Sequence, residues 1–309
     1  MIREAGPATR VARVADRMTR RRALGVFGAV GAGAAGLLAA ARNLGSPAPR
    51  PKVAAGTTRL VEAYGDRPQQ QGEWWLPAVA GRLPTVVLVH GGYWRAGYDR
   101  SLEDAVAADL AARGFLVWNI DYRPSADPWP ATLTDVAAAY DLLTTGRHAD
   151  RVDPARVAVA GHSAGGHLAL WLASRDRLPP GAPGSGRTGP APSLLVAQAP
   201  VAALVDGARQ GLGGGAVTAL LGGSPERVPD RYAAADPVAL LPTGVPSVLV
   251  HAPGDDLVPI SQSESYVAAA TAAGDDSRLV RVEGGHFEHL DPASAAVTAL
   301  RTALEGLGI

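Results

Sequence analysis

Short apolar runs alternate with longer amphipathic stretches over most of this chain. The runs are rich in Val, Leu and Ala and are bounded by turn residues, which is typical of buried strands. They lie at residues 85–89, 116–120, 157–160, 194–197, 247–250 and 279–282, and helical patterns occupy residues 102–113, 131–145, 165–174, 261–273 and 293–307. Strands and helices that alternate in this way predict an α/β fold, a mostly parallel doubly wound sheet with helices on both faces.

The segments around this alternation set the expected domain limits. Residues 58–64 and 73–76 are predicted to be two opening antiparallel strands. Residues 201–238 lie between two predicted strands and carry only weak helical patterns, at 216–221 and 230–235. We expect an N-terminal extension at 1–45, a Pro-rich linker at 46–56 and one α/β domain at 57–309 with residues 201–238 as an insert.

The run from Arg156 to His167 joins an apolar strand to a helix through the motif Gly161-His162-Ser163-Ala164-Gly165. Strand, G-x-S-x-G turn and helix in this order are typical of a nucleophile elbow. We expect glycine to be required at positions 161 and 165 because the strand and helix backbones nearly touch there. The turn would lift the Ser163 hydroxyl clear of the sheet. The alternative is an ordinary strand-to-helix turn in which Ser163 only caps the helix.

A serine nucleophile needs a base, and in such folds the acid and the histidine follow the serine in that order. Glu283-Gly-Gly-His286 follows a predicted strand, and its glycines would let the His286 imidazole swing over the sheet. His289 is the alternative, although we expect it to be a surface or capping residue. His167 and His251 are expected to be structural.

Asp255 and Asp256 compete for the role of the acid. Both follow the predicted strand that ends near His251, and the spacing Asp-x-x-Val-Pro favours Asp255. We expect Asp255 to hold the His286 ring in its working tautomer, and Asp256 to face the solvent.

An oxyanion hole is predicted where another buried strand breaks into His90-Gly91-Gly92-Tyr93-Trp94. Glycines after the strand would let backbone N–H groups approach a substrate oxygen, together with the N–H of Ala164. His90 itself is expected to be structural.

These elements, in this order, resemble the α/β-hydrolase superfamily over roughly residue 57 to the C-terminus. His90-Gly-Gly-Tyr-Trp94, the elbow and Gly-His286-Phe resemble the branch that holds hormone-sensitive-lipase-type esterases and kynurenine formamidases (arylformamidases). The resemblance implies that Gly92 and Tyr93 donate to the oxyanion. Lipase-type members usually have a third glycine where this chain has Tyr93, so the Tyr-Trp pair is closer to the formamidases.

The resemblance also has implications for the substrate pocket and for the residues beside the site. It implies that an insert such as residues 201–238 caps the pocket, and that the segment from Asn119 to Arg123 is scaffold beside the site. Trp94 and Trp129, with Tyr93, are candidates for an aromatic substrate pocket, although buried aromatic residues more often belong to a core.

The N-terminus carries a second signal. Arg20, Arg21 and Arg22 precede an uncharged run at residues 25–41, rich in Ala and Gly, which resembles a Tat export signal. We expect an exported protein, with cleavage near residues 39–41 or with the run kept as a membrane anchor. A cytoplasmic protein with abundant arginine is the alternative, and Met18 is a second candidate start.

Composition narrows the chemistry. The 309 residues carry a formal net charge of zero and no cysteine, so thiol chemistry and disulfides are excluded, and nothing favours a nucleic-acid partner. His286-Phe-Glu-His289 lacks the order of the H-E-x-x-H zinc motif, and neither metal nor cofactor is expected. The oligomeric state is left open.

These patterns together predict acyl transfer to water by Ser163, His286 and Asp255 on a small carboxylic ester. An aryl amide is the alternative substrate, less favoured because a formamidase normally acts in the cytosol. A peptidase of the prolyl-oligopeptidase type would carry an aromatic residue after the serine and a propeller domain, which this chain lacks. An inactive fold that only binds ligands is the remaining alternative.

Overall fold

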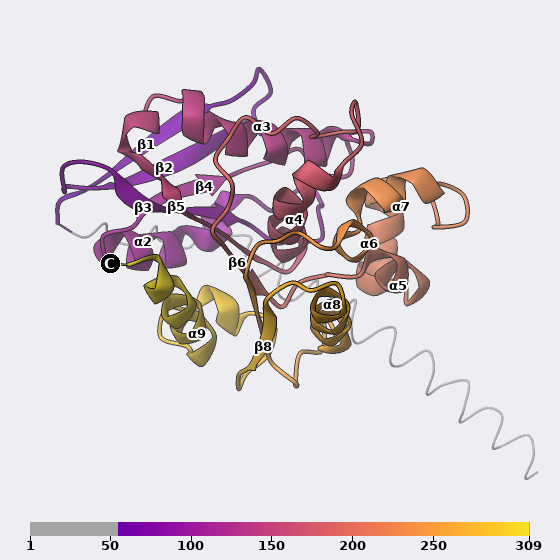
Figure 1. The fold of residues 1–309 in the computed structure, drawn as a ribbon. Helices are drawn as coiled ribbons and strands as arrows, with labels where there is room; N and C mark the ends of the chain where they lie inside the picture. The colour runs from indigo at the N-terminus through magenta and orange to yellow at the C-terminus, as the bar shows by residue number, and fades with distance from the viewer. Residues whose placement is uncertain (1–54, 309) are drawn as a thin grey trace, which may run out of the picture. The chain divides into compact units, whose positions relative to one another are not determined.

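The computed structural model describes residues 55–308, and they form one mixed sheet flanked by helices (Figure 1). The strands are β1 (Thr57–Ala63), β2 (Gln71–Pro77), β3 (Leu83–Val89), β4 (Leu116–Ile120), β5 (Val152–His162), β6 (Leu194–Gln198), β7 (Ser247–His251) and β8 (Ser277–Arg281). The α-helices are α2 (Asp104–Ala112), α3 (Ala131–Thr145), α4 (Ala164–Ala173), α5 (Leu204–Arg209), α6 (Leu212–Leu221), α7 (Pro229–Ala235), α8 (Ser261–Ala272) and α9 (Ala295–Leu304). Short 3-10 turns precede α2 at Arg100–Glu103 and follow α9 at Glu305–Leu307.

The strand order is β1-β2-β4-β3-β5-β6-β7-β8. The β1–β2 and β2–β4 pairs are antiparallel, and every pair from β4 to β8 is parallel. The predicted doubly wound α/β sheet and its two antiparallel opening strands are confirmed. The carboxyl ends of the parallel strands therefore share one edge, where α/β proteins place their sites.

Helices cover both faces of the sheet. On one face, α2 and α9 pack their apolar side chains against alternate residues of the central strands, such as Val86 and Leu88. On the other face lie α3, α4 and α8 (Figure 1). All seven residues of β3 are buried, which explains its continuous apolar sequence.

Several element limits differ from the predicted ones. β5 begins at Val152, before the apolar run, because Val152 pairs with Leu83 although Pro154 interrupts the pattern. The insert between β6 and β7 contains the short helix α5, which was not predicted, in addition to α6 and α7. The expected limits near residues 45 and 56 concern a region that lies mostly outside the described residues, and they stay predictions.

Helix α4 begins directly against β3 and β5. A methyl group added at Gly165 would lie 1.9 Å from the Val89 carbonyl oxygen, and one at Gly161 would lie 2.3 Å from the Gly165 carbonyl oxygen. Real Cβ atoms do not come so close to backbone, so both positions require glycine. The steric reason for G-x-S-x-G is therefore visible in the packing.

Gly165→Ala should lower the free energy of unfolding by about 3 kcal/mol or more, because backbone rather than a flexible side chain must move. Gly306→Ala is the matched control, since a methyl group there meets nothing within 4 Å and should change stability by less than about 1 kcal/mol. Urea denaturation of the two variants measures the difference. Equal stability of the two would contradict this description of the elbow.

Candidate active site

Ser163 occupies the sharp turn between β5 and α4. Its backbone lies at φ 57° and ψ −117°, a conformation that costs a non-glycine residue about 1–3 kcal/mol and is held only by its surroundings. The Ser163 N–H donates to the Gln198 carbonyl at the end of β6, 2.8 Å away. The turn thus fixes a strained serine at the carboxyl edge of the sheet, with Ala164 as the first residue of α4.

Asp255 and His286 come together from two loops at that edge. Asp255 follows β7 and His286 follows β8, and His286 Nδ1 donates to Asp255 Oδ2 over 2.7 Å. The other carboxylate oxygen accepts the N–H groups of Leu257 and Val258, both at 2.9 Å. Asp256, the alternative acid, is exposed.

The buried Asp255 carboxylate stays ionised because its donors outweigh its burial. Burial alone would raise the pKa of Asp255, but hydrogen bonds from His251 and His286 and from the Val258 N–H hold it well below its ordinary value. His251 Nε2 lies 3.5 Å from Asp255 Oδ2 and 2.9 Å from the Val258 carbonyl, while its Nδ1 accepts from Ser263 Oγ over 2.7 Å. The structural role expected for His251 therefore includes direct contact with the acid.

Further imidazoles surround His286. The His162 ring centroid lies 4.5 Å from that of His286 and 5.5 Å from that of His289, which stacks on it. Burial, then the neighbouring His286 and His251, lowers the pKa of His289 to about 3. The expectation that His289 is a surface or capping residue is wrong, because its side chain is fully buried. Its spacing one turn after His286 gave no sign of this packing.

The glycine turn after β3 lies directly against Ser163. A methyl group added at Gly91 would lie 2.9 Å from the His162 carbonyl oxygen and 3.1 Å from Ser163 Cβ. Gly92, Tyr93 and Trp94 all have positive φ values, of 110°, 52° and 55°. Their backbone amides therefore belong to a tight left-handed turn beside Ser163.

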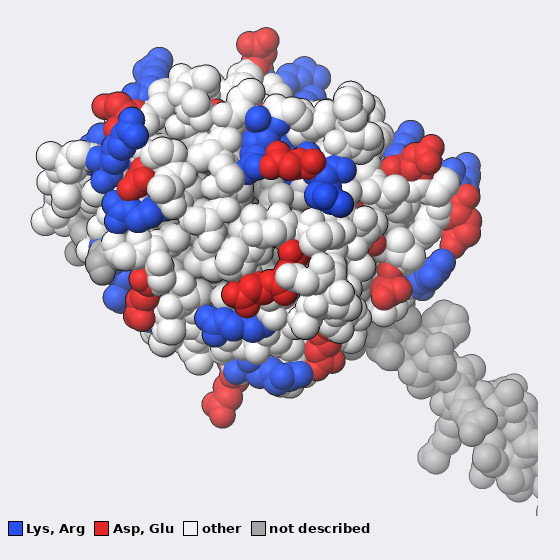
Figure 2. Space-filling model, in the orientation of Figure 1, with Lys and Arg blue, Asp and Glu red and all other residues white. Residues whose placement is uncertain are grey.

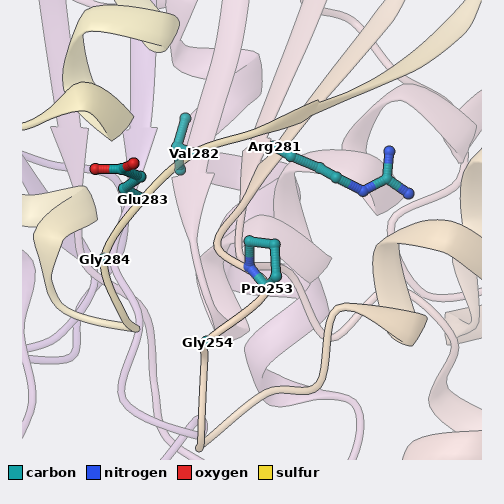
Figure 3. Close-up of a pocket in the computed structure, with 6 residues that line it drawn as sticks. All are labelled: Pro253, Gly254, Arg281, Val282, Glu283 and Gly284. Carbon is teal, nitrogen blue, oxygen red and sulfur yellow. The ribbon is translucent and has the colours of Figure 1, made fainter.

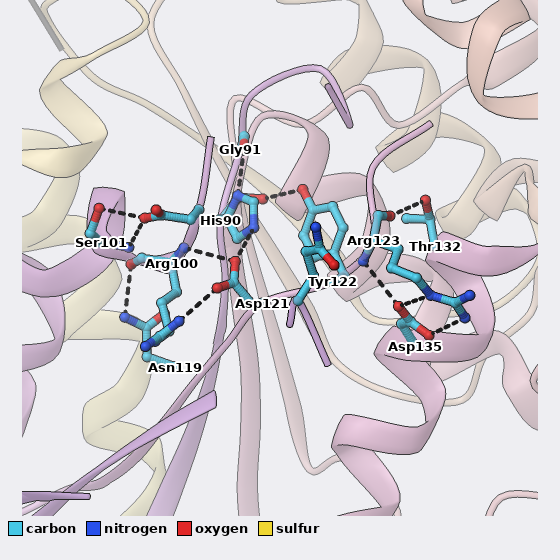
Figure 4. Close-up of polar contacts among 12 residues, drawn as sticks. His90, Gly91, Arg100, Ser101, Asn119, Asp121, Tyr122, Arg123, Thr132 and Asp135 are labelled. Atoms are coloured by element: carbon cyan, nitrogen blue, oxygen red, sulfur yellow. Dashed lines mark hydrogen bonds and ion pairs between the residues drawn. The ribbon is translucent and has the colours of Figure 1, made fainter. Parts of the chain in front are cut away.

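A polar network supports this turn from below (Figure 4). The Tyr122 hydroxyl donates to the His90 carbonyl over 2.8 Å, and the two rings stack with centroids 4.3 Å apart. His90 Nε2 lies 3.2 Å from Asp121 Oδ1, and Arg100 donates to the other oxygen of Asp121 over 2.7 Å. The expected structural role of His90 and of the Asp121-Tyr122 pair matches these contacts. Arg123 in turn pairs with Asp135 of α3.

Glu103 lies beside this network and is 1 % exposed. Burial, then the adjacent carboxylate of Asp104, raises the pKa of Glu103 to about 8. The side chain therefore carries a proton at neutral pH, which removes the cost of burying its charge.

The candidate pocket residues differ in their placement. Trp94 is buried and packs edge-on against His167 of α4, with ring centroids 5.2 Å apart. Trp129 lines a small pocket with Leu220 of α6, and the Arg231 guanidinium lies 6.0 Å from its ring centroid. Trp94 thus follows the glycine turn, whereas Trp129 faces the insert.

The insert is tied to the elbow helix and to the glycine turn. His167 Nε2 and Trp171 Nε1 donate to the Ala235 and Ala234 carbonyls at the end of α7, over 3.0 Å and 2.9 Å. Arg95 donates to the Gly213 carbonyl at the start of α6. The capping role expected for residues 201–238 stays a prediction, and the insert is anchored to α4 and to the segment that follows the glycine turn.

A pocket of about 370 Å³ lies beside the loops that carry Asp255 and His286 (Figure 3). Pro253 and Gly254, which precede Asp255, form one wall, and Val282, Glu283 and Gly284, which precede His286, form another. Arg281 also lines the pocket, and its guanidinium donates to Glu264 over 2.8 Å. The pocket therefore touches the backbone that leads into both residues of the pair.

Over residues 55–308 no cluster of three His, Asp or Glu side chains is arranged to hold a metal ion, and no helix is long and apolar enough for a membrane span. Acidic and basic side chains are interspersed on the face in Figure 2, without a patch of one sign. The expected export signal lies outside the described residues.

The chain is similar to a known family and, over part of its length, to curated esterases. The BD-FAE family model matches residues 74–269, more than half of the chain. Carboxylesterase NlhH of Mycobacterium tuberculosis is 36 % identical over 107 residues, which cover 34 % of this chain and 33 % of that protein. Esterase LipQ of the same organism is 27 % identical over 237 residues, which cover 74 % of this chain and 56 % of LipQ. The aligned regions thus span about a third to a half of these relatives.

Solved structures share the fold. A truncated carbohydrate esterase from gut microbiota superposes with a TM-score of 0.73 at 19 % identity, over 83 % of this chain and 99 % of that one. Esterase B from Lactobacillus Rhamnosis superposes with a TM-score of 0.72 at 21 % identity, over 89 % and 93 % of the two chains. The α/β-hydrolase fold expected from the sequence is confirmed.

The buried Glu103 carboxyl should make stability depend on pH. The folded chain keeps this proton up to about pH 8, whereas an unfolded glutamate releases it near pH 4.3, so the folded state binds more protons between these values. The free energy of unfolding of the wild type should therefore fall as the pH rises through this window, by a few kcal/mol relative to Glu103→Gln. Denaturant titrations from pH 5 to 8 measure the gap, and Glu305→Gln, which removes an exposed carboxyl, should follow the wild type. A constant gap between Glu103→Gln and the wild type would contradict the buried, protonated state.

Proposed function

Because the chain belongs to the BD-FAE family, we propose that it is a serine hydrolase that cleaves small carboxylic esters. One observation carries the proposal. A hydrogen-bonded Asp255–His286 pair stands at the same sheet edge as a strained serine, which lies in contact with a glycine turn. Nucleophile, base with its orienting acid, and backbone donors are the parts that acyl transfer requires.

Ser163 is the proposed nucleophile and His286 its base. Since His286 uses its Nδ1–H for Asp255, its Nε2 carries a free lone pair that can accept the Ser163 proton. The Ser163 oxygen then bonds to the ester carbonyl carbon. When the tetrahedral intermediate collapses, the bond to the alcohol oxygen breaks and His286 returns the proton to that oxygen. A water molecule then attacks the acyl-enzyme, with His286 again taking and returning the proton, and the carboxylic acid product and free Ser163 are released.

Asp255 and the turn amides stabilise the charges that arise. The carboxylate lies against Nδ1 and offsets the positive charge on the His286 imidazolium, without taking the proton itself. The N–H groups of Gly92, Tyr93 and Ala164 are the proposed donors to the oxyanion. The positive-φ turn beside Ser163 and the start of α4 behind it support that assignment.

Esters are the preferred substrates. The relatives named as carboxylesterase and esterase support this class, and the balanced surface charge gives no reason for a polyionic substrate. Hydrolysis of an aryl formamide is the second candidate, which the Tyr93-Trp94 pair at the turn favours. Trp94 and Trp129 are then candidate pocket residues, and the insert at 201–238 is the proposed cap over the acyl or alcohol part.

We also propose that the chain is exported by the Tat pathway, on the evidence of the twin arginines and the uncharged run that follows them.

Turnover of p-nitrophenyl acetate, p-nitrophenyl butyrate and N-formylkynurenine by the purified chain tests the function and its alternative. We expect the acetate and butyrate esters to be the better substrates. Ser163→Ala should abolish turnover, and Asp255→Asn should lower kcat by about 10⁴-fold because the His286 tautomer is lost. Asp256→Asn is the matched control and should stay within about threefold of the wild type. Equal effects of the two Asn variants would refute the acid assignment, and a wild type without turnover of any acyl substrate would refute the function.

Replacing Arg20 and Arg21 by lysine should leave the precursor in the cytoplasm, because Tat export depends on the arginine pair. Fractionation of cells that express each form, followed by immunoblotting, measures the distribution. An unchanged distribution would contradict export by this pathway.

A further inference from the structure

His162, the residue just before Ser163, makes a hydrogen bond to the loop that carries His286. This loop, residues 282–290, is called the base loop below. His162 Nε2 lies 2.8 Å from the carbonyl oxygen of His286, a residue 124 positions later in the chain. Because a carbonyl oxygen can only accept, Nε2 carries the proton. The side chain is 3 % exposed, so water does not compete for this bond.

The base loop has few other ties to the centre of the sheet. Gly284 has a φ of 117°, a conformation that favours glycine, and the Gly285 N–H donates within the loop, to Glu288. The Gln198 amide reaches the loop one turn later, at the His289 carbonyl, over 3.3 Å. Asp255 meets the His286 ring over 2.7 Å, and the bond from His162 meets the His286 backbone.

His162 also touches the glycine turn. A methyl group added at Gly91 would lie 3.2 Å from His162 Nδ1. One imidazole thus contacts the turn of the proposed oxyanion hole and the base loop, and its own backbone continues into Ser163.

The neutral form of His162, which donates through Nε2, persists over a wide pH range. Burial, then the neighbouring rings of His286 and His289, lowers the pKa of His162 well below its ordinary value. The side chain therefore adds no positive charge beside the base, and Nδ1 stays unprotonated.

We propose that His162 is a positioning residue, whose hydrogen bond to the His286 carbonyl sets the imidazole of the base at the Ser163 hydroxyl. The inference rests on the proposed hydrolase function. Proton transfer needs donor and acceptor about 3 Å apart, and a displacement of about 1 Å can cost on the order of 100-fold in rate. A contact that joins the residue before the nucleophile to the backbone of the base controls that separation directly.

Two amide variants separate positioning from packing. In His162→Gln the side-chain amide reaches the place of Nε2 and can still donate to the His286 carbonyl, whereas in His162→Asn it is one methylene too short. His162→Leu removes the donor and keeps apolar volume. We expect the Asn and Leu variants to lose about 10- to 100-fold in kcat on p-nitrophenyl acetate, with KM within about threefold of the wild type. The Gln variant should retain activity within about fivefold.

The rate at which a fluorophosphonate labels Ser163 gives a second readout and should fall in parallel with kcat. Thermal melting identifies any variant that does not fold, and the Asn–Gln pair still decides if Leu fails. His148→Gln, a substitution at a distant histidine, is the control for the change of residue type. Asn and Leu variants as fast as the wild type, or a Gln variant as slow as Asn, would overturn the inference and leave the proposed function intact. A wild type that neither hydrolyses esters nor reacts with the probe would overturn the proposed function, and this inference with it.

Discussion

The close contact between α4 and the two strands beneath it, β3 and β5, sets the geometry of the site. At Gly161 and Gly165 the backbones meet so closely that a single methyl group would overlap carbonyl atoms. Because the chain must pass from strand to helix within this space, Ser163 takes a left-handed conformation that its side chain would otherwise avoid. The same crossing brings the Gly91 turn against Ser163. Packing of the fold thus determines where the reactive groups of the proposed hydrolase lie.

The hydrogen bonds around Asp255 offset the cost of burying its charge. The Asp255 carboxylate accepts from two backbone N–H groups and from His286, and His251 lies against it, so its charge is compensated without a cation. Burial keeps His162 and His289 neutral by lowering the pKa of each. These two rings therefore add packing, and His162 a hydrogen bond, without adding charge.

Local signals account for what the sequence predicted well. The parallel strands are apolar because helices cover both faces of the sheet. The elbow glycines are recognisable because the close backbone contact excludes any larger residue. Features that arise from distant contacts were missed. The pairing of Val152 with Leu83 extends β5 past Pro154, and α5 has no clear period of its own. The burial of His289 and the bond from His162 to His286 join segments far apart in sequence, so no pattern around either residue could reveal them.

We propose that the surroundings of Ser163 activate its hydroxyl, and mass spectrometry after covalent labelling can show this. The purified chain is incubated with a fluorophosphonate, and its intact mass and then its proteolytic peptides are measured. We expect one adduct per chain, carried by the peptide that contains Ser163 and absent from Ser163→Ala. A chain that stays unmodified, or an adduct that persists at another residue in that variant, would contradict it.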